Sequence, residues 1–322
     1  MEAKLPEKLE NFEVLIGGKY ALDIRKKLNT GKCKSVYCGR ELKTNKLVAI
    51  KYEYKFEITW CISDESDIYD YLEGIEHIPK KYMYGEEKEY FYLVIELLGN
   101  TLQNIMDSLD GKFTLATTLK ISLQVLKILE NIHKKGVVLR YLKPENMALG
   151  YGENKDYIYL FDFGLAKRYI RDGEHKPYKE GKNSKGNKLF ISVNIHFGRQ
   201  VSRRDDIESF GYNLIYFMKG KLPWSEYYRD TEKIQNIKST ISLDELCQGL
   251  PKEFKEFLKY GKEMKFTEEP DYKYLNSLLL KVAEKNDIDI NSVKYDWDIN
   301  KEKILLNENK VDTSEKIDNK WK

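Results

Sequence analysis

Residues 137–146 read Val-Val-Leu-Arg-Tyr-Leu-Lys-Pro-Glu-Asn, and the interpretation of the whole chain depends on them. They follow a largely apolar run of helical period, residues 117–133, and precede a short β-type run, residues 157–161. That second run ends at Asp162-Phe163-Gly164. Asn146 and Asp162 carry the oxygen atoms that Mg²⁺ prefers as ligands, so the order of these elements predicts a magnesium site.

A lysine earlier in the chain points to a nucleotide. Residues 48–51, Val-Ala-Ile-Lys, read as a β-strand that ends in Lys51, and a lysine in this place can hold the α- and β-phosphates. Lys51 needs a carboxylate on a helix, and we choose Glu65 in the helical stretch 63–73, with Asp64 and Asp67 as surface acids. A lysine at a strand end is usually only a solvated residue. Because Lys51, Asn146 and Asp162 occur in this order on the expected elements, we favour a nucleotide-binding role for Lys51 over that of a surface residue.

Composition limits the class of protein. The 322 residues include 55 basic and 52 acidic ones, a net charge of +3 that indicates neither nucleic acid nor a membrane as partner. The four cysteines and four histidines show no metal-ligand spacing, which fits a reducing compartment. The first ten residues lack the apolar core of a signal peptide. We expect a cytoplasmic location, with the nucleus as an alternative, and no secretion; the sequence does not indicate an oligomeric state.

The order of elements indicates an α+β protein with two lobes. Short β-type runs dominate up to residue 98, and helical runs follow at 102–109, 117–133, 205–218 and 251–266. We expect an N-lobe over residues 12–96, a hinge near residues 96–99 and a C-lobe over residues 97–300. The polar residues 301–322 are expected to form a disordered tail.

Five motifs in combination resemble the casein kinase 1 family of protein kinases. They are residues 95–102 (Ile-Glu-Leu-Leu-Gly-Asn-Thr-Leu), 162–167 (Asp-Phe-Gly-Leu-Ala-Lys), 192–194 (Ser-Val-Asn), 202–209 (Ser-Arg-Arg-Asp-Asp-Ile-Glu-Ser) and 222–224 (Leu-Pro-Trp). The resemblance runs from about residue 20 to residue 297. It implies a bilobal kinase fold, ATP with Mg²⁺ between the lobes, and Ser/Thr protein substrates near acidic or phosphorylated residues.

The resemblance also implies roles for individual residues. Asn146 and Asp162 would bind magnesium, Lys143 would act in catalysis, Arg140 would be structural, and Asp206 would anchor the catalytic loop backbone. The residues implied for ATP are Asn29, Gly31, Val36, Ala49, Lys51, Glu65, Glu96, Leu98 and Ala148.

The catalytic loop departs from the family where the chemistry is done. Tyr141 stands where the family has the Asp that accepts the proton of the substrate hydroxyl, and Leu139 stands at the preceding His. A phenol with a pKa of about 10 is protonated at neutral pH and cannot act as that base. We expect Leu139 to fill the space beneath Phe163 without harm to folding.

Three other positions depart as well. The loop at residues 29–34 keeps only Gly31 of three glycines, which weakens its hold on the phosphates. Ala148 replaces a leucine of the adenine floor, while Val36 and Ala49 still supply the roof. Leu189 stands where an arginine binds the phosphate of primed substrates, and an aliphatic side chain cannot bind an oxyanion.

Two main functional hypotheses remain, beside a minor third, a module that no longer binds nucleotide. The first is a pseudokinase that binds ATP weakly and acts as a binding or scaffold module. The alternative is an active or residually active Ser/Thr kinase in which Glu145 or the substrate manages the proton, while Lys143, Asn146 and Asp162 supply the electrostatics.

Overall fold

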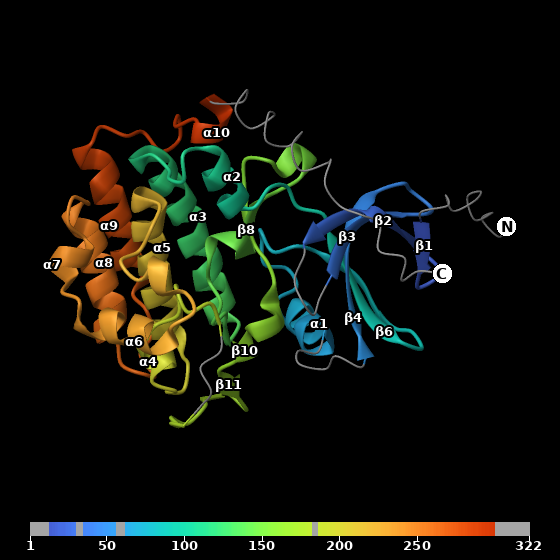
Figure 1. Ribbon diagram of the computed structural model, residues 1–322, viewed down its shortest axis with the longest axis horizontal. Coiled ribbons are helices and arrows are strands. Elements are labelled where there is room, and N and C mark those ends of the chain that lie inside the picture. Colours follow the sequence, from blue (N-terminus) through green and yellow to red (C-terminus); the bar gives the residue numbers. More distant parts are fainter. Residues whose placement is uncertain (1–12, 30–34, 56–61, 182–185, 300–322) are drawn as a thin grey trace.

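The computed structural model describes residues 13–29, 35–55, 62–181 and 186–299. A β-rich lobe lies beside a larger helical lobe (Figure 1). The predicted bilobal α+β fold is therefore confirmed. Two expectations, on Gly31 in the glycine loop and on the tail at residues 301–322, lie outside the described residues.

The smaller lobe is one antiparallel sheet with the strand order β1-β2-β3-β4-β6-β5. Its strands are β1 (Glu13–Ile16), β2 (Tyr20–Asn29), β3 (Ser35–Glu41), β4 (Leu47–Tyr54), β5 (Lys81–Glu86) and β6 (Tyr90–Glu96), with helix α1 (Ile62–Tyr71) between β4 and β5 in the chain. Alternate residues of β4 face opposite sides. Ile50 and Tyr52 join one apolar cluster, whereas Ala49 joins the cluster that extends into the larger lobe. Lys51 shares the alternation of Ala49 and so faces the larger lobe.

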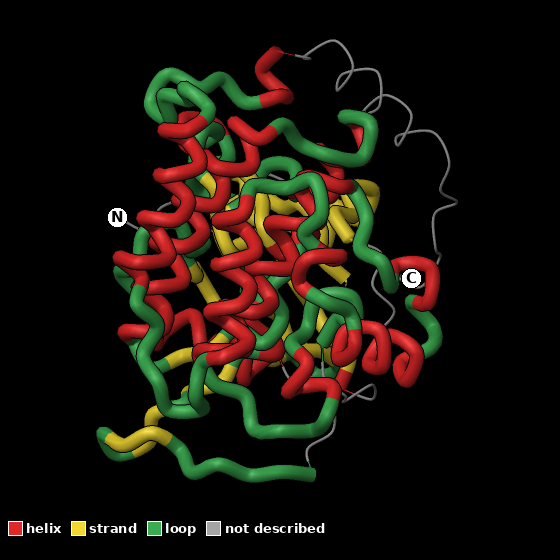
Figure 2. Tube along the Cα trace, turned by 90° about the vertical axis from the view of Figure 1, so that its left-hand side faces the viewer, coloured by secondary structure: helices red, strands yellow, loops and turns green. Residues whose placement is uncertain are grey.

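The larger lobe contains most of the helices. These are α2 (Leu102–Ser108), α3 (Leu115–Lys134), α4 (Val193–His196), α5 (Arg203–Lys219), α6 (Thr231–Thr240), α7 (Leu243–Leu246), α8 (Lys252–Glu263), α9 (Tyr272–Lys285) and α10 (Asp296–Ile299). The short elements near the interlobe boundary are β7 (Val137–Val138), η2 (Pro144–Asn146), β8 (Met147–Leu149), β9 (Ile158–Leu160), η4 (Phe163–Leu165), β10 (Lys167–Arg168), β11 (Ile170–Arg171) and β12 (Glu174–His175). Figure 2 shows the helices in front and the sheet behind them.

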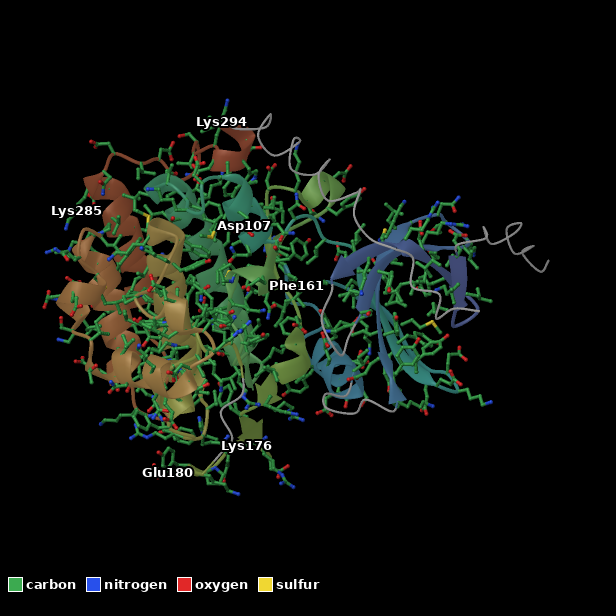
Figure 3. The ribbon with its side chains drawn as sticks, in the orientation of Figure 1. Asp107, Phe161, Lys176, Glu180, Lys285 and Lys294 are labelled. Atoms are coloured by element: carbon green, nitrogen blue, oxygen red, sulfur yellow. The ribbon has the colours of Figure 1, made fainter. Side chains whose placement is uncertain are left out.

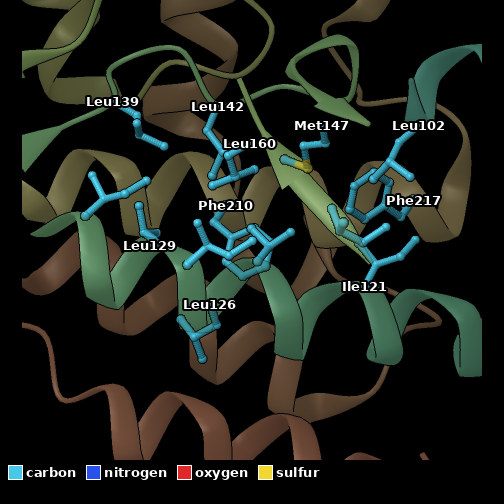
Figure 4. Close-up of a cluster of buried hydrophobic side chains, with 14 of the residues drawn as sticks. Leu102, Ile121, Leu126, Leu129, Leu139, Leu142, Met147, Leu160, Phe210 and Phe217 are labelled. Carbon is cyan, nitrogen blue, oxygen red and sulfur yellow. The ribbon is translucent and has the colours of Figure 1, made fainter. Parts of the chain in front are cut away.

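Helix α3 is the central element of the C-lobe core. The Thr114 hydroxyl caps its first turn by accepting a hydrogen bond from Thr117 N at 3.3 Å. Leu126 and Leu129 of α3 belong to the same buried cluster as Leu139 and Leu142 (Figure 4). Residues that flank Tyr141 are therefore anchored in the hydrophobic core, and the loop is held by packing on both sides of the altered position.

The structure adds elements that the sequence did not predict. Strands β1 and β5, helices α6 and α9, and the β11–β12 hairpin were not expected. Two-residue strands are too short to show a period of two. Helix α9 carried a usable signal, because Leu275, Leu278, Leu279 and Val282 recur at helical spacing. Among the described residues, the helices lack the apolar length needed to span a bilayer.

Candidate active site

Lys51, Glu65 and Asp162 meet between the two lobes. Lys51 Nζ lies 2.6 Å from Glu65 Oε2 and 2.8 Å from Asp162 Oδ1. Burial alone would lower the pKa of Lys51, but Asp162 and then Glu65 outweigh burial and raise that pKa above its ordinary value. Lys51 is thus a charged, fixed ammonium, while 34% of the Asp162 side chain stays exposed.

Helix α1 presents differently the three acids that the sequence offered as partners for Lys51. Glu65 is buried against Lys51, whereas Asp64 is exposed and pairs with Lys167 at 2.9 Å. Asp67 is exposed on the same helix. The carboxylate chosen from the sequence is therefore the one that meets Lys51, because the helix turns only one of the three toward β4.

The Asp-Phe-Gly motif is held by aromatic packing. The Phe163 ring meets the Tyr69 ring of α1 edge-on, with centroids 4.9 Å apart. Leu139 and Phe163 are both buried in one apolar cluster, so a leucine at this position is compatible with a packed loop. Asp162 adopts a left-handed backbone, with φ +63°, just before η4.

Asp206 holds the catalytic loop from helix α5. Its carboxylate accepts hydrogen bonds from Leu139 N at 2.7 Å and Arg140 N at 2.8 Å. Arg140 has φ +67°, a conformation costly for a residue with a side chain, which these bonds help to maintain. The Arg140 guanidinium donates to Leu165 O at 3.2 Å and so ties the loop to η4.

His133 adds a link to Asp206 that sequence reasoning missed. Its Nε2 lies 3.0 Å from Asp206 Oδ2, and its Nδ1 is hydrogen-bonded to the Tyr272 hydroxyl of α9. All three side chains are buried. Helices α3, α5 and α9 therefore converge on the anchor of the catalytic loop, and the only sequence signal was a His at the end of an apolar helix.

Tyr141 occupies the loop in a half-buried position. The Lys143 ammonium lies over its ring, 4.6 Å from the centroid, and 3.9 Å from Glu145 Oε1. Gly186 also lies close to the ring, since a Cβ added there would lie 3.5 Å from Tyr141 Cδ2. The phenol ring thus fills space between the catalytic loop and the segment that begins at Gly186.

Asn146 is oriented in a way that suits a metal ion. Its side-chain amide donates from Nδ2 to Tyr141 O at 3.0 Å, so Oδ1 is the amide atom that could bind a metal ion. Among the described residues, three or more His, Cys, Asp or Glu side chains do not gather at one metal-binding point. Magnesium here would need Asn146, Asp162 and oxygens of a bound phosphate together.

The residues expected around adenine surround the hinge. Glu96 ends β6 and Leu98 follows it, both half-buried, and Gly99 N donates to Leu149 O at 2.8 Å. Ala49 and Ala148 are almost fully buried, and Val36 packs against the shared core cluster. Gly31 lies outside the described residues, and of Asn29 the structure describes the backbone at the end of β2.

Side chains of the C-lobe hydrogen-bond to the backbone carbonyls of the segment that carries Leu189. Trp224 Nε1 donates to Leu189 O at 2.8 Å, and Lys238 Nζ donates to Lys188 O and Ile191 O at 2.8 Å and 2.7 Å. His196 Nε2 also contacts Lys188 O, at 3.2 Å. Lys238 and His196 were not predicted, because a lysine on the polar helix α6 reads as a surface residue. The Leu189 side chain packs against an apolar cluster.

Comparison with known proteins agrees with this geometry. The model of the protein kinase domain matches residues 22–286. Casein kinase I homolog 2 of Schizosaccharomyces pombe is 36% identical over 297 residues, which cover 89% of this chain and 66% of the relative. Casein kinase I homolog 3 of the same yeast is 36% identical over 288 residues, 85% of this chain and 64% of the relative. The chain thus spans slightly less than two thirds of the length of these relatives. It belongs to the protein kinase family and is casein kinase I-like.

Proposed function

We propose that this casein kinase I-like chain is a pseudokinase that binds Mg-ATP weakly and serves as a binding or scaffold module for a protein partner. The observation that carries the proposal is Tyr141 at the place of the catalytic base, with the Lys143 ammonium over its ring. A protonated phenol accepts no proton from a substrate hydroxyl, and its ring occupies the space that the hydroxyl needs.

The expected loss of rate is large. General-base catalysis contributes roughly 10²–10⁴-fold, or about 3–5 kcal/mol of barrier. Kinase turnover of about 1–100 s⁻¹ would fall to roughly 10⁻⁴–1 s⁻¹ before any misalignment is counted. Engagement of Lys143 by the Tyr141 ring removes a second group from the γ-phosphate and lowers the rate further.

The nucleotide site supports retained binding. The ammonium of Lys51, fixed between Glu65 and Asp162, is placed to meet phosphate oxygens. Asn146 Oδ1 and Asp162 would hold Mg²⁺, which supplies positive charge against the phosphates when bound. Adenine would lie between Val36 and Ala49 on one side and Ala148 on the other, beside the backbone of residues 96–98.

Phosphoryl transfer is tested with radiolabelled ATP and casein. Wild type is run beside Asp162→Ala, which removes the metal ligand and gives the background. The proposal expects misalignment and the engagement of Lys143 to reduce the wild-type signal to the background of Asp162→Ala. A wild-type signal that disappears in Asp162→Ala contradicts it.

Nucleotide binding is tested separately by a thermal shift. Free ligand at 100 times its Kd stabilises a folded protein by about 2.7 kcal/mol, so millimolar Mg-ATP raises the Tm even when binding is weak. No shift at millimolar Mg-ATP contradicts the nucleotide part of the proposal and leaves the scaffold part to stand alone.

The second candidate function is a residually active Ser/Thr kinase. The position of Glu145 favours it, because this carboxylate lies 3.9 Å from Lys143 and 40% of the side chain is exposed. Phosphoryl transfer relies mainly on positioning and charge, so a neighbouring acid or the substrate can manage the proton at a reduced rate. A casein signal in wild type that is lost in both Glu145→Gln and Asp162→Ala supports this candidate.

A further inference from the structure

Lys238 is a fully buried lysine that the nucleotide chemistry does not use. It lies on α6 with 0% of its surface exposed. Burying an ammonium costs several kcal/mol unless polar groups replace its water. A lysine retained at such a place therefore needs an explanation in its contacts.

Backbone carbonyls are the hydrogen-bond acceptors of Lys238. Its Nζ donates to Lys188 O at 2.8 Å and to Ile191 O at 2.7 Å. The ammonium also lies beside two aromatic rings that contact each other, 4.9 Å from the Tyr212 centroid and 5.0 Å from the Trp224 centroid. Within the described ranges it forms no ion pair with a carboxylate.

The charged groups around Lys238 are already engaged or of the same sign. Glu208 is the nearby acid, and its Oε1 accepts from Val193 N at 2.9 Å and from the Tyr212 hydroxyl at 2.7 Å. Lys188 and Lys262 are the other charged neighbours, and both are positive. The carbonyl oxygens of the segment are thus the partners that the cation has.

The same segment receives two further donors from the C-lobe. Trp224 Nε1 donates to Leu189 O at 2.8 Å, and His196 Nε2 contacts Lys188 O at 3.2 Å. Donors from three parts of the C-lobe therefore hold the carbonyls of residues 188, 189 and 191. This segment begins at Gly186, which lies close to the ring of Tyr141.

We propose that Lys238 is a positioning residue for protein recognition. From inside the C-lobe its ammonium sets the conformation of residues 186–191, and this segment presents Lys188 and Leu189 to a protein partner or substrate. The docking role rests on the proposed function. The clamp, by which we mean the hydrogen bonds from Lys238 and Trp224 to the carbonyls of residues 188, 189 and 191, depends only on observed contacts.

Hydrogen exchange of the full chain tests the clamp. Lys238→Met keeps the length and apolar packing of the side chain but loses both donors. Losing both donors leaves the carbonyls of Lys188 and Ile191 without these hydrogen bonds, whereas removing a buried charge is favourable, so the two effects on the Tm oppose each other. The amides of Leu189, Phe190 and Ile191, which bond to Asn187, should exchange about tenfold faster.

Lys233→Met is the matched control, because Lys233 lies on the same helix and is exposed over Tyr227. The control should leave the exchange of these amides unchanged. Equal exchange in wild type and Lys238→Met, or equal acceleration in both variants, would overturn the clamp.

Trp224→Phe decides the question if Lys238→Met does not fold. This change keeps an aromatic ring in the core and removes only the donor to Leu189 O. The same amides should then exchange about threefold faster, since one hydrogen bond is lost. Unchanged exchange in this variant contradicts the clamp.

The docking role is tested by kinetics in a Tyr141→Asp background. Adding Lys238→Met should raise KM for casein about fivefold, because a loosened segment must be ordered on binding, and leave KM for ATP unchanged. An unchanged KM for casein contradicts the docking role. A Tyr141→Asp protein without turnover would count against the proposed function. It would not count against the clamp, which hydrogen exchange tests by itself.

Discussion

Two regions of the molecule each contain a buried lysine, and the two lysines are stabilised in opposite ways. The nucleotide half is the region of Lys51, Glu65 and Asp162, and the protein-facing half is the segment of residues 186–191 with Lys238 beneath it. In the nucleotide half, Lys51 lies between two carboxylates, which raise its pKa. In the protein-facing half, Lys238 contacts neutral carbonyls, and burial lowers its pKa well below the ordinary value.

The difference separates a site that binds charged groups from a site that fixes the conformation of the backbone. Lys51 and its partners form an arrangement that phosphates and a metal ion can join. Lys238 donates to the backbone carbonyls of Lys188 and Ile191. On the proposed function, the nucleotide half keeps its phosphate- and metal-binding groups, whereas the protein-facing half differs from the family at Tyr141 and Leu189.

The largest effect is expected from Tyr141→Asp. Restoring a carboxylate base should raise phosphoryl transfer to casein roughly 10²–10⁴-fold, measured with radiolabelled ATP. Tyr141→Phe is the control, because it keeps the ring without adding a base, and it should give no gain. Flat turnover in Tyr141→Asp would place the limit in the glycine loop or in residues 187–189 instead.

The next effect should come from Lys51→Met in the nucleotide half. Removing the cation leaves Glu65 buried without its ammonium, which should cost about 3 kcal/mol of unfolding free energy and abolish the Mg-ATP thermal shift. Lys167→Met removes the exposed pair with Asp64 and should cost less than about 1 kcal/mol. Equal costs in denaturant unfolding would mean that the buried arrangement has no special role.

In the protein-facing half, His196 should make stability depend on pH. Burial, and then Lys238, lower the pKa of His196 from 6.5 to about 3. The unfolded chain therefore binds the proton first as the pH falls, so this contribution is complete above about pH 6.5 and is lost toward pH 3. Between pH 7 and pH 5 the loss should be about 2 kcal/mol. His196→Gln keeps a donor for Lys188 O and should flatten the pH dependence of unfolding by that amount; an unchanged slope contradicts the assignment.

The smallest effect is expected from Leu189→Arg. A guanidinium at this position should raise the affinity for a phosphoserine peptide about fivefold, or about 1 kcal/mol, measured by fluorescence anisotropy. Leu189→Met keeps the position apolar and should leave that affinity unchanged. No gain with arginine would show that the clamped backbone directs this side chain away from the bound peptide.

The sequence predicted the nucleotide half better than the protein-facing half. Lys51, Glu65 and Asp162 could be found because each follows directly from its own strand or helix and from motif order. Lys238 and the contact of His133 with Tyr272 depend on helices packed from distant parts of the chain, and neither residue has a local pattern that distinguishes it from a surface or core residue. The strand pairing of β11 with β12 was missed for a related reason, since two residues carry no readable period.

The anchoring of the catalytic loop has a genetic consequence. Asp206 accepts hydrogen bonds from the backbone at Leu139 and Arg140, and Leu139 and Leu142 are buried in the core, so the loop has anchors that do not involve the side chain at position 141. Tyrosine and aspartate codons differ at one base. A single base change would therefore place a carboxylate at position 141 on a backbone that is anchored on both sides of it.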